Sequence, residues 1–302
     1  MSDLKLFCLE GDGVRELEGQ SVAIEKSLQN LMEKNLQDFL NIRFVTSEYS
    51  TSKSHKGRID TLGLDENNCP VIIEYKRALN ENVINQGLYY LDWLMDHKAE
   101  FKLLILEKYG KEVADSIEWS SPRLLCIAGD FTKYDEYAVQ QINRNIELIR
   151  YKKYGNQFIL LELVNATTAA SSQTTSVGEG SDSVQSTVVE LLAKSHKDVQ
   201  DRFDLLKESL LALGDDVQMK TLKHYFAFKR FGNFACAEVH PFKKRILVYV
   251  KVNPDSCVLE DGFTRDVRTV GHYGTGDLEI TISTNDDLER AKPLLLKSYE
   301  GS

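Results

Sequence analysis

Apolar and polar positions along the first half of the chain switch between a helical period and a strand period. A stretch with helical period predicts a helix over 21–40. Its apolar positions are Ile24, Leu28, Leu31, Met32, Leu36 and Phe39. Further helices are expected over 81–98, 102–117 and 135–145, and strands over 4–9, 42–49, 71–76, 123–128, 146–151 and 157–163. Strands that alternate with covering helices indicate a three-layer α/β core.

Residues 165–187 contain almost no large apolar side chain, so this stretch cannot bury a core. We expect a flexible linker there, between a domain over 1–164 and a second domain over 188–302. The second domain is predicted to hold a helix over 188–213, strands over 225–230, 235–239, 245–252 and 278–283, and a last helix through Ser298 with Asn285 as its N-cap. This pattern predicts a smaller α+β domain.

Composition limits the classes of protein to which the chain can belong. With 302 residues, of which 42% are hydrophobic and 27% charged, it is typical of a soluble protein with two domains. No apolar run has the length of a membrane span, and the N-terminus lacks a signal-peptide pattern. The cysteines are Cys8, Cys69, Cys126, Cys236 and Cys257. Because they form no CxxC pair, they argue against a zinc site and a disulfide framework, and for the cytoplasm. The net charge of −9 argues against a protein that coats DNA indiscriminately.

The most informative segment is Gly-Arg-Ile-Asp at 57–60, which is followed by Val-Ile-Ile-Glu-Tyr-Lys at 71–76. Residues two apart on a strand point to the same face, so Glu74 and Lys76 should project together. A turn predicted at 65–68 would return the chain and bring Asp60 to the same corner of the sheet.

Two carboxylates and a lysine at one corner have a chemical use. Asp60 and Glu74 suit Mg²⁺ or Mn²⁺, and the carbonyl of Tyr75 could be a further ligand. A bound cation would activate water and neutralise phosphate charge, and Lys76 would orient that water. An ion-pair cluster at a sheet edge would use the same residue types and is the alternative interpretation.

The set Asp60, Glu74 and Lys76 resembles the Asp…Glu-x-Lys core of the PD-(D/E)xK nuclease superfamily. The Gly-Arg-Ile-Asp strand before it is similar to the NucS-like endonuclease branch of the RecB-like nucleases, with Ile59 where the superfamily often has proline. The resemblance covers 21–106. It implies a restriction-endonuclease-like mixed sheet flanked by helices, and an endonuclease that hydrolyses DNA with Mg²⁺ or Mn²⁺ in repair or foreign-DNA defence. It is also compatible with a homodimer.

Three further residues are assigned to the site by this resemblance. Gln86 and Tyr90 lie four apart on one helical face, as does the Gln-x-x-x-Tyr pair of similar nucleases. Such nucleases also carry an acidic residue on the first helix, and the candidates are Glu25 and Glu33. Glu25 falls inside the apolar arc and Glu33 nearer the solvent face, so we favour Glu25. A carboxylate that only stabilises the helix N-terminus is the alternative for Glu25.

Other basic and polar segments allow two interpretations. Lys53, His55, Lys56 and Arg58 could contact phosphates or form a solvated loop. The mixed segment 223–231 could stack bases or form an ordinary strand, and the polar loop 262–276 could bind phosphate or only turn the chain. The second domain resembles domains of unknown function that are fused to such nuclease cores.

Two alternatives to a DNA nuclease stay open. One is a nucleic-acid or protein-binding module that keeps the nuclease fold without cleaving, and the other is a phosphoesterase acting on a small nucleotide. A complete Asp60, Glu74 and Lys76 set favours the nuclease, because binding alone does not require all three residues. The pattern does not separate DNA from RNA, or single from double strands.

Overall fold

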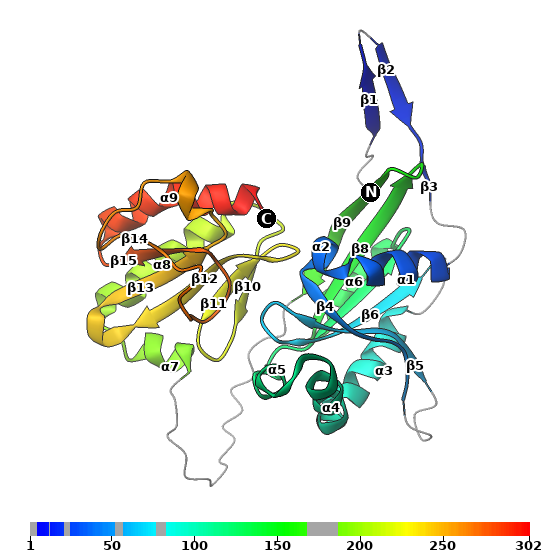
Figure 1. Ribbon diagram of the computed structural model, residues 1–302, viewed down its shortest axis with the longest axis horizontal. Helices are drawn as coiled ribbons and strands as arrows, with labels where there is room; N and C mark the ends of the chain where they lie inside the picture. Colours follow the sequence, from blue (N-terminus) through cyan, green and yellow to red (C-terminus); the bar gives the residue numbers. More distant parts are fainter. Residues whose placement is uncertain (1–4, 12, 21–24, 52–56, 77–82, 168–186) are drawn as a thin grey trace. The chain divides into compact units, whose positions relative to one another are not determined.

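The computed structural model describes residues 5–11, 13–20, 25–51, 57–76, 83–167 and 187–302, without the side chains of Glu10 and Glu25. The chain divides into two compact units, one of residues 1–117 and 122–167 and one of residues 118–121 and 168–302 (Figure 1). Within the described ranges, no helix combines the length and apolar character needed to cross a lipid bilayer.

A mixed sheet of seven strands forms the centre of the first unit. Its order is β3-β8-β7-β6-β5-β4, with β9 also paired to β8. The strands are β3 (Gly19–Gln20), β4 (Ile42–Ser50), β5 (Arg58–Asp65), β6 (Pro70–Lys76), β7 (Arg123–Ala128), β8 (Asn145–Tyr154) and β9 (Phe158–Thr167). β6, β7 and β8 run parallel, and the other pairs are antiparallel. Every residue of β7 is buried, as expected for a parallel strand covered on both faces.

Helices cover both faces of this sheet. They are α1 (Glu25–Lys34), α2 (Leu36–Leu40), α3 (Val83–Asp96), α4 (Lys98–Tyr109), α5 (Lys111–Asp115) and α6 (Lys133–Gln140). α1 lies over the face that carries Thr61, because Glu33 accepts a hydrogen bond from that hydroxyl. α3 lies over the opposite face, where Gly87 packs against Leu124. The expected α/β fold, a mixed sheet flanked by helices, is therefore confirmed.

Several boundaries differ from those expected. The helix expected over 21–40 is interrupted at Asn35, and the one over 102–117 at Gly110, whose φ of +86° is outside helical geometry. The strand expected over 4–9 is half of a hairpin, β1 (Leu6–Glu10) with β2 (Gly13–Leu17). β9 continues to Thr167, beyond the expected domain end at 164. The segments 21–24, 81–82 and 168–186 of the expected elements lie outside the described residues.

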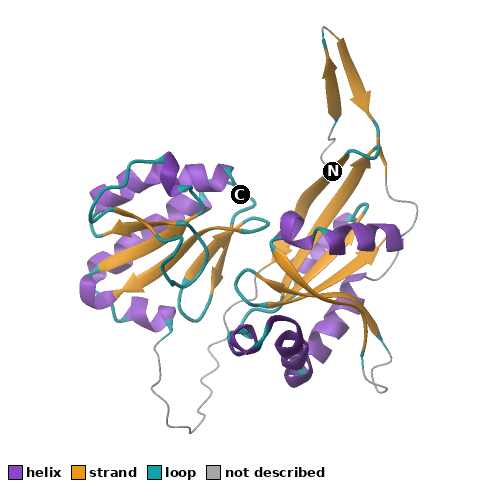
Figure 2. Cartoon of the chain, viewed as in Figure 1, coloured by secondary structure: helices purple, strands orange, loops and turns teal. Residues whose placement is uncertain are grey.

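The second unit is an antiparallel sheet of six strands with helices packed on it (Figure 2). The order β10-β11-β12-β13-β15-β14 comprises β10 (Gln218–Thr221), β11 (Phe226–Lys229), β12 (Asn233–His240), β13 (Arg245–Val250), β15 (Leu278–Ile282) and β14 (Thr264–Asp266). The helices are α7 (Val188–Ala193), α8 (Lys197–Leu211) and α9 (Asn285–Glu300). Their apolar faces share one core with alternate strand residues such as Val248 and Ile280.

Two expectations for this unit were wrong. The helix expected over 188–213 is divided into α7 and α8. The N-cap of α9 is Thr284, not Asn285. The Thr284 hydroxyl accepts a hydrogen bond from the backbone N–H of Asp287, and the Asp287 carboxylate accepts one from the backbone N–H of Thr284. This reciprocal capping box satisfies two helix-end donors at once.

Candidate active site

Asp60 and Glu74 meet where the ladder between β5 and β6 ends. The last paired residues are Thr61 and Ile73, and one further step would place Asp60 opposite Glu74. Instead of backbone pairing, the Asp60 N–H donates to Oε1 of Glu74 at 3.2 Å, and the Tyr75 N–H donates to Oδ2 of Asp60 at 3.0 Å. Each carboxylate thus binds the other strand's backbone, which brings two acidic groups together at the opening of the sheet.

One of the two carboxylates is shielded from solvent. Glu74 is 0% exposed, whereas Asp60 is half-buried. Burial, followed by the charges of Glu33, Asp60 and Glu74, raises the pKa of the Tyr75 hydroxyl far above its ordinary value. Burial and then the charge of Glu74 likewise raise the pKa of the Cys126 thiol on β7. Negative charge concentrated at a partly buried site favours binding of a cation.

Lys76 is the last residue of β6 and is half-buried. The alternation of a strand places its side chain on the face that carries Glu74, as the sequence indicated. An ammonium group at this position can offset charge that develops on a phosphate during hydrolysis. The structure therefore brings the three residues of the motif to one corner of the sheet.

Gln86 and Tyr90 lie on α3 and contact the beginning of β5, the strand that carries Asp60. The Gln86 amide donates to the Tyr90 hydroxyl at 3.1 Å, and that hydroxyl accepts from the backbone N–H of Arg58 at 3.1 Å. A side chain at Gly57 would collide with the Tyr90 ring, since an added Cβ would lie 2.4 Å from its Cε1. The pair therefore fixes the beginning of β5, two residues before Asp60, and only glycine allows the ring to come so close.

The position of Glu33 on α1 differs from the one that a helical wheel predicted. Glu33, expected near the solvent face, is half-buried and accepts hydrogen bonds from Thr61 at 2.6 Å and from Gln29 at 2.9 Å. The helical wheel counted only apolar residues, whereas the buried face of α1 also contains Gln29 beside Leu28 and Met32 and therefore extends toward Glu33. Glu25 is the first residue of α1, and its side chain lies outside the described residues, so its role stays a prediction.

Gln29 is a neighbour of the site that sequence reasoning did not identify. It is 4% exposed, and its amide donates to the carbonyl oxygen of Asp60 at 2.9 Å. The same amide lies 3.2 Å from the hydroxyl of Ser47 on β4. A glutamine on an otherwise apolar helix face, one turn before Glu33, was the available signal. It holds the backbone of Asp60 in place.

The basic residues near the site are partly neutralised within the chain. Arg58 and Lys26 both bind Glu48 on β4 at 2.7 Å. Lys53, His55 and Lys56, which were expected to contact phosphates or solvent, lie outside the described residues. Glu48 therefore reduces the positive charge that Lys26 and Arg58 present near Asp60.

The donor set at the corner fits a hard divalent cation. Asp60 and Glu74 offer carboxylate oxygens, and the Tyr75 carbonyl could be a third oxygen ligand. Over the described ranges of the chain, no group of three or more His, Cys, Asp or Glu is arranged to hold a metal ion. Mg²⁺ commonly binds through one or two carboxylates and keeps several waters, so two carboxylates are sufficient for it.

In the second unit, the segment 223–231 forms an ordinary strand at its centre. Phe226, Ala227, Phe228 and Lys229 of β11 are all buried. Their aromatic rings belong to the core beneath the helices, and Phe203 packs on Phe226 at 4.5 Å between ring centroids. The strand interpretation is confirmed for these residues, and base stacking on the two rings is excluded.

Comparison with known sequences connects the whole chain to one relative and its second unit to one family. The family model described as a domain of unknown function, DUF5655, matches residues 188–302. A protein of Haemophilus influenzae, described as uncharacterized, is 28% identical over 307 residues, covering 98% of this chain and all of that protein. The alignment therefore spans both units of this chain.

Two solved structures are similar to part of the chain. A repair endonuclease from Pyrococcus abyssi matches with 17% identity and a TM-score of 0.29, over 43% of this chain and 49% of that one. An EndoMS–dsDNA complex matches with 16% identity and a TM-score of 0.25, over 43% of this chain and 47% of that one. The similarity spans only about half of each solved chain, so a function for this protein has to be argued from its own site.

Proposed function

We propose that the first unit is a Mg²⁺- or Mn²⁺-dependent nuclease that hydrolyses phosphodiester bonds in DNA. One observation carries the proposal: Asp60 and Glu74 bind each other's strands where the β5–β6 ladder ends, with Lys76 on the face of Glu74. Two adjacent carboxylates repel one another, and a bound cation relieves that repulsion. The choice of DNA follows the Asp…Glu-x-Lys resemblance.

Each residue then has a defined task. Asp60 and Glu74 would hold the cation, which when bound lowers the pKa of a water and neutralises charge on a phosphate oxygen. Lys76 would orient the attacking water and stabilise the negative charge of the transition state. Gln86 and Tyr90 would keep β5 in position through the Arg58 backbone. Cleavage of this kind would serve DNA repair or defence against foreign DNA.

The test is a cleavage assay with the full chain on single-stranded, branched and mismatched DNA, with Mg²⁺, Mn²⁺ or EDTA. Asp60→Ala and Lys76→Ala should abolish metal-dependent cleavage. Asp115→Ala and Lys102→Ala are matched controls, because these residues form an exposed ion pair with each other on the same unit at 2.7 Å. Full activity in the Asp60 or Lys76 variants would refute the proposal. DNA binding without turnover under either metal would support a non-cleaving binding module instead.

A further inference from the structure

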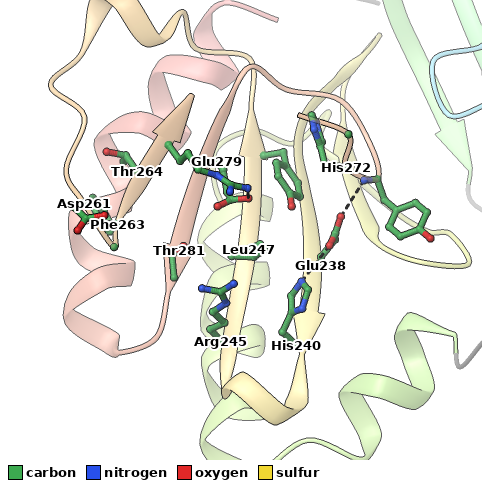
Figure 3. A pocket seen from close by; sticks show the side chains of 15 residues that line it. Glu238, His240, Arg245, Leu247, Asp261, Phe263, Thr264, His272, Glu279 and Thr281 are labelled. Atoms are coloured by element: carbon green, nitrogen blue, oxygen red, sulfur yellow. Dashed lines mark hydrogen bonds and ion pairs between the residues drawn. The ribbon is translucent and has the colours of Figure 1, made fainter. Parts of the chain in front are cut away.

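The second unit contains a pocket of about 410 Å³ on the face of its sheet opposite the helical core (Figure 3). Its floor is formed by alternate residues of β12, β13 and β15, among them Glu238, Leu247 and Thr281, which lie side by side in the ladder. Its wall is the loop that contains His272 and Tyr273. Pockets of this size are large enough for a small organic ligand.

The wall of this pocket is fixed in place by close contacts. The Tyr273 N–H donates to Oε1 of Glu238 at 3.0 Å, and the Thr275 N–H lies 3.4 Å from the Cys236 sulfur. Gly274 has φ +82°, and an added Cβ there would lie 2.6 Å from the Cβ of Cys236. The loop can approach β12 this closely only with glycine. The pocket is therefore built into the fold.

Two of the three carboxylates that line the pocket, those of Glu238 and Glu279 but not that of Asp261, are already engaged. Glu238 accepts from the Tyr273 backbone and lies 3.1 Å from the His240 ring nitrogen Nε2. Glu279 binds Arg265 at 2.8 Å. Arg245 differs from Arg265, because its Nε is buried and has no hydrogen-bond partner among the residues described. A buried guanidinium nitrogen without an acceptor is costly, so this end of the pocket suits an anionic oxygen.

The opposite end of the pocket has an unused acceptor. Nδ1 of His272 lies 2.9 Å from the carbonyl oxygen of Val270, so this nitrogen must carry the proton and donate. With a proton on Nδ1, Nε2 is the ring nitrogen left to accept a hydrogen bond, and it is buried and has no partner within the described part of the chain. The ring stacks on Tyr249 at 4.2 Å between centroids. Figure 3 shows Arg245 beside His240 at one end of the lined surface and His272 at the other.

We infer that this pocket binds a nucleotide, with its phosphate on Arg245 and an amino or hydroxyl group of its nucleoside on Nε2 of His272. The phosphate supplies the acceptor that Nε of Arg245 lacks, and the nucleoside supplies the donor that Nε2 of His272 lacks. The ring of Tyr273, which is 47% exposed at the pocket wall, can cover a planar base. The nucleotide can be free or part of a nucleic-acid strand. The inference does not depend on nuclease activity in the first unit.

Calorimetric titration of the full chain in EDTA tests this site while preventing metal-dependent cleavage. The probes are deoxyadenosine monophosphate, deoxyadenosine, inorganic phosphate and a 5′-phosphorylated oligodeoxyadenosine. Arg245→Gln should weaken binding of both phosphorylated adenosine probes by about tenfold or more. Arg230→Gln is the control, because Arg230 is already paired with Asp216 at 2.6 Å in the same unit. Tighter binding of the mononucleotide would identify a free nucleotide, and tighter binding of the oligonucleotide would identify a strand.

Two further measurements separate recognition from a structural effect. Arg245→Gln should leave the melting temperature unchanged or raise it, since the guanidinium nitrogen loses no partner within the described residues. His272→Ala should weaken binding of the mononucleotide but not of inorganic phosphate. The inference is overturned if neither adenosine phosphate binds, if Arg245→Gln binds as tightly as the native chain, or if inorganic phosphate binds as tightly as the mononucleotide.

Discussion

Asp60 and Asp65 lie near opposite ends of β5, and the fold treats their charges differently. Asp65 is 1% exposed and binds Arg123 at 3.0 Å, and Arg123 also binds Glu147 at 2.7 Å. Asp60 is half-buried and lies against a second carboxylate, Glu74. The buried arginine beside Asp65 stabilises the fold, whereas Asp60 and Glu74 place two carboxylates next to each other, an arrangement that a bound cation would stabilise.

The largest expected effect is on stability, at the Asp65 end. Burial alone would lower the pKa of Arg123, but the charges of Glu147 and Asp65 raise it above its ordinary value. Arg123→Met would leave both carboxylates buried without their cation, which costs about 3–5 kcal/mol of unfolding free energy. Urea unfolding at neutral pH measures this loss. The triple variant that also carries Asp65→Asn and Glu147→Gln should recover part of it, and a loss below about 1 kcal/mol for Arg123→Met would contradict a structural role.

The opposite result is expected at the Asp60 end. Asp60→Asn keeps the size of the side chain but removes a negative charge beside Glu74, so stability should stay equal or rise. Cleavage should fall by about a hundredfold to a thousandfold, the range seen when one group that stabilises a transition state is removed. Calorimetry with Mn²⁺ gives a readout other than activity, and the variant should bind the ion more weakly. A stability loss comparable to that of Arg123→Met, with normal Mn²⁺ binding, would make Asp60 a structural residue like Asp65.

A smaller effect is expected where α3 positions β5. Gly57→Ala would force apart the backbone and the Tyr90 ring, because the added Cβ lies 2.4 Å from Cε1. Overpacking of this kind costs about 1–3 kcal/mol, measured by thermal unfolding. The same substitution in a Tyr90→Ala background should cost much less, because the ring is gone. Equal costs in the two backgrounds would show that Tyr90 does not restrict Gly57.

The sequence predicted the Asp60 corner but not the Asp65 cluster, and the reason is physical. Asp60, Glu74 and Lys76 occupy consecutive strands joined by a short turn, so local alternation is enough to place them together. Asp65, Arg123 and Glu147 come from β5, β7 and β8, and their meeting depends on the strand order of the whole sheet. The pattern of one segment does not contain that order, so a buried ion cluster of this kind cannot be predicted locally.

The same limit explains the error on α1. Hydrophobic periodicity correctly located helix around Leu28 and Met32, but it gave no indication of the break at Asn35. It also did not show that Gln29 belongs to the buried face of α1, so the expected direction of Glu33, one turn further on, did not match its contact with Thr61. In the second unit, alternation correctly predicted β12 and β13, whereas the pocket around Arg245 depends on a loop that crosses back over β12. Sequence pattern predicts elements and their faces, but packing decides which polar groups meet.

The smallest expected effect concerns Glu48, whose situation is intermediate between those of Asp60 and Asp65. A hydrogen bond from Lys26 is the main cause that lowers the pKa of Glu48, and the charge of Arg58 lowers it further. A carboxylate with a lowered folded-state pKa stabilises the protein above its ordinary titration range, and this contribution is lost as the pH falls through the folded-state pKa. Because the side chain is 29% exposed, solvent screens the pairs and the contribution should stay within about 1 kcal/mol.

Glu48→Gln tests this intermediate case by comparing the native and variant chains at two pH values. The variant should be less stable at pH 7, and the difference should shrink as the pH falls below the ordinary titration range of glutamate, where the native carboxylate takes up its proton. Urea unfolding at both pH values measures the difference, and Asp115→Asn is the control for an ion pair away from the site. The same substitution also releases Lys26 and Arg58 near Asp60, so it should strengthen DNA binding at low salt. A difference in stability that does not change with pH would mean that Glu48 acts through packing rather than charge.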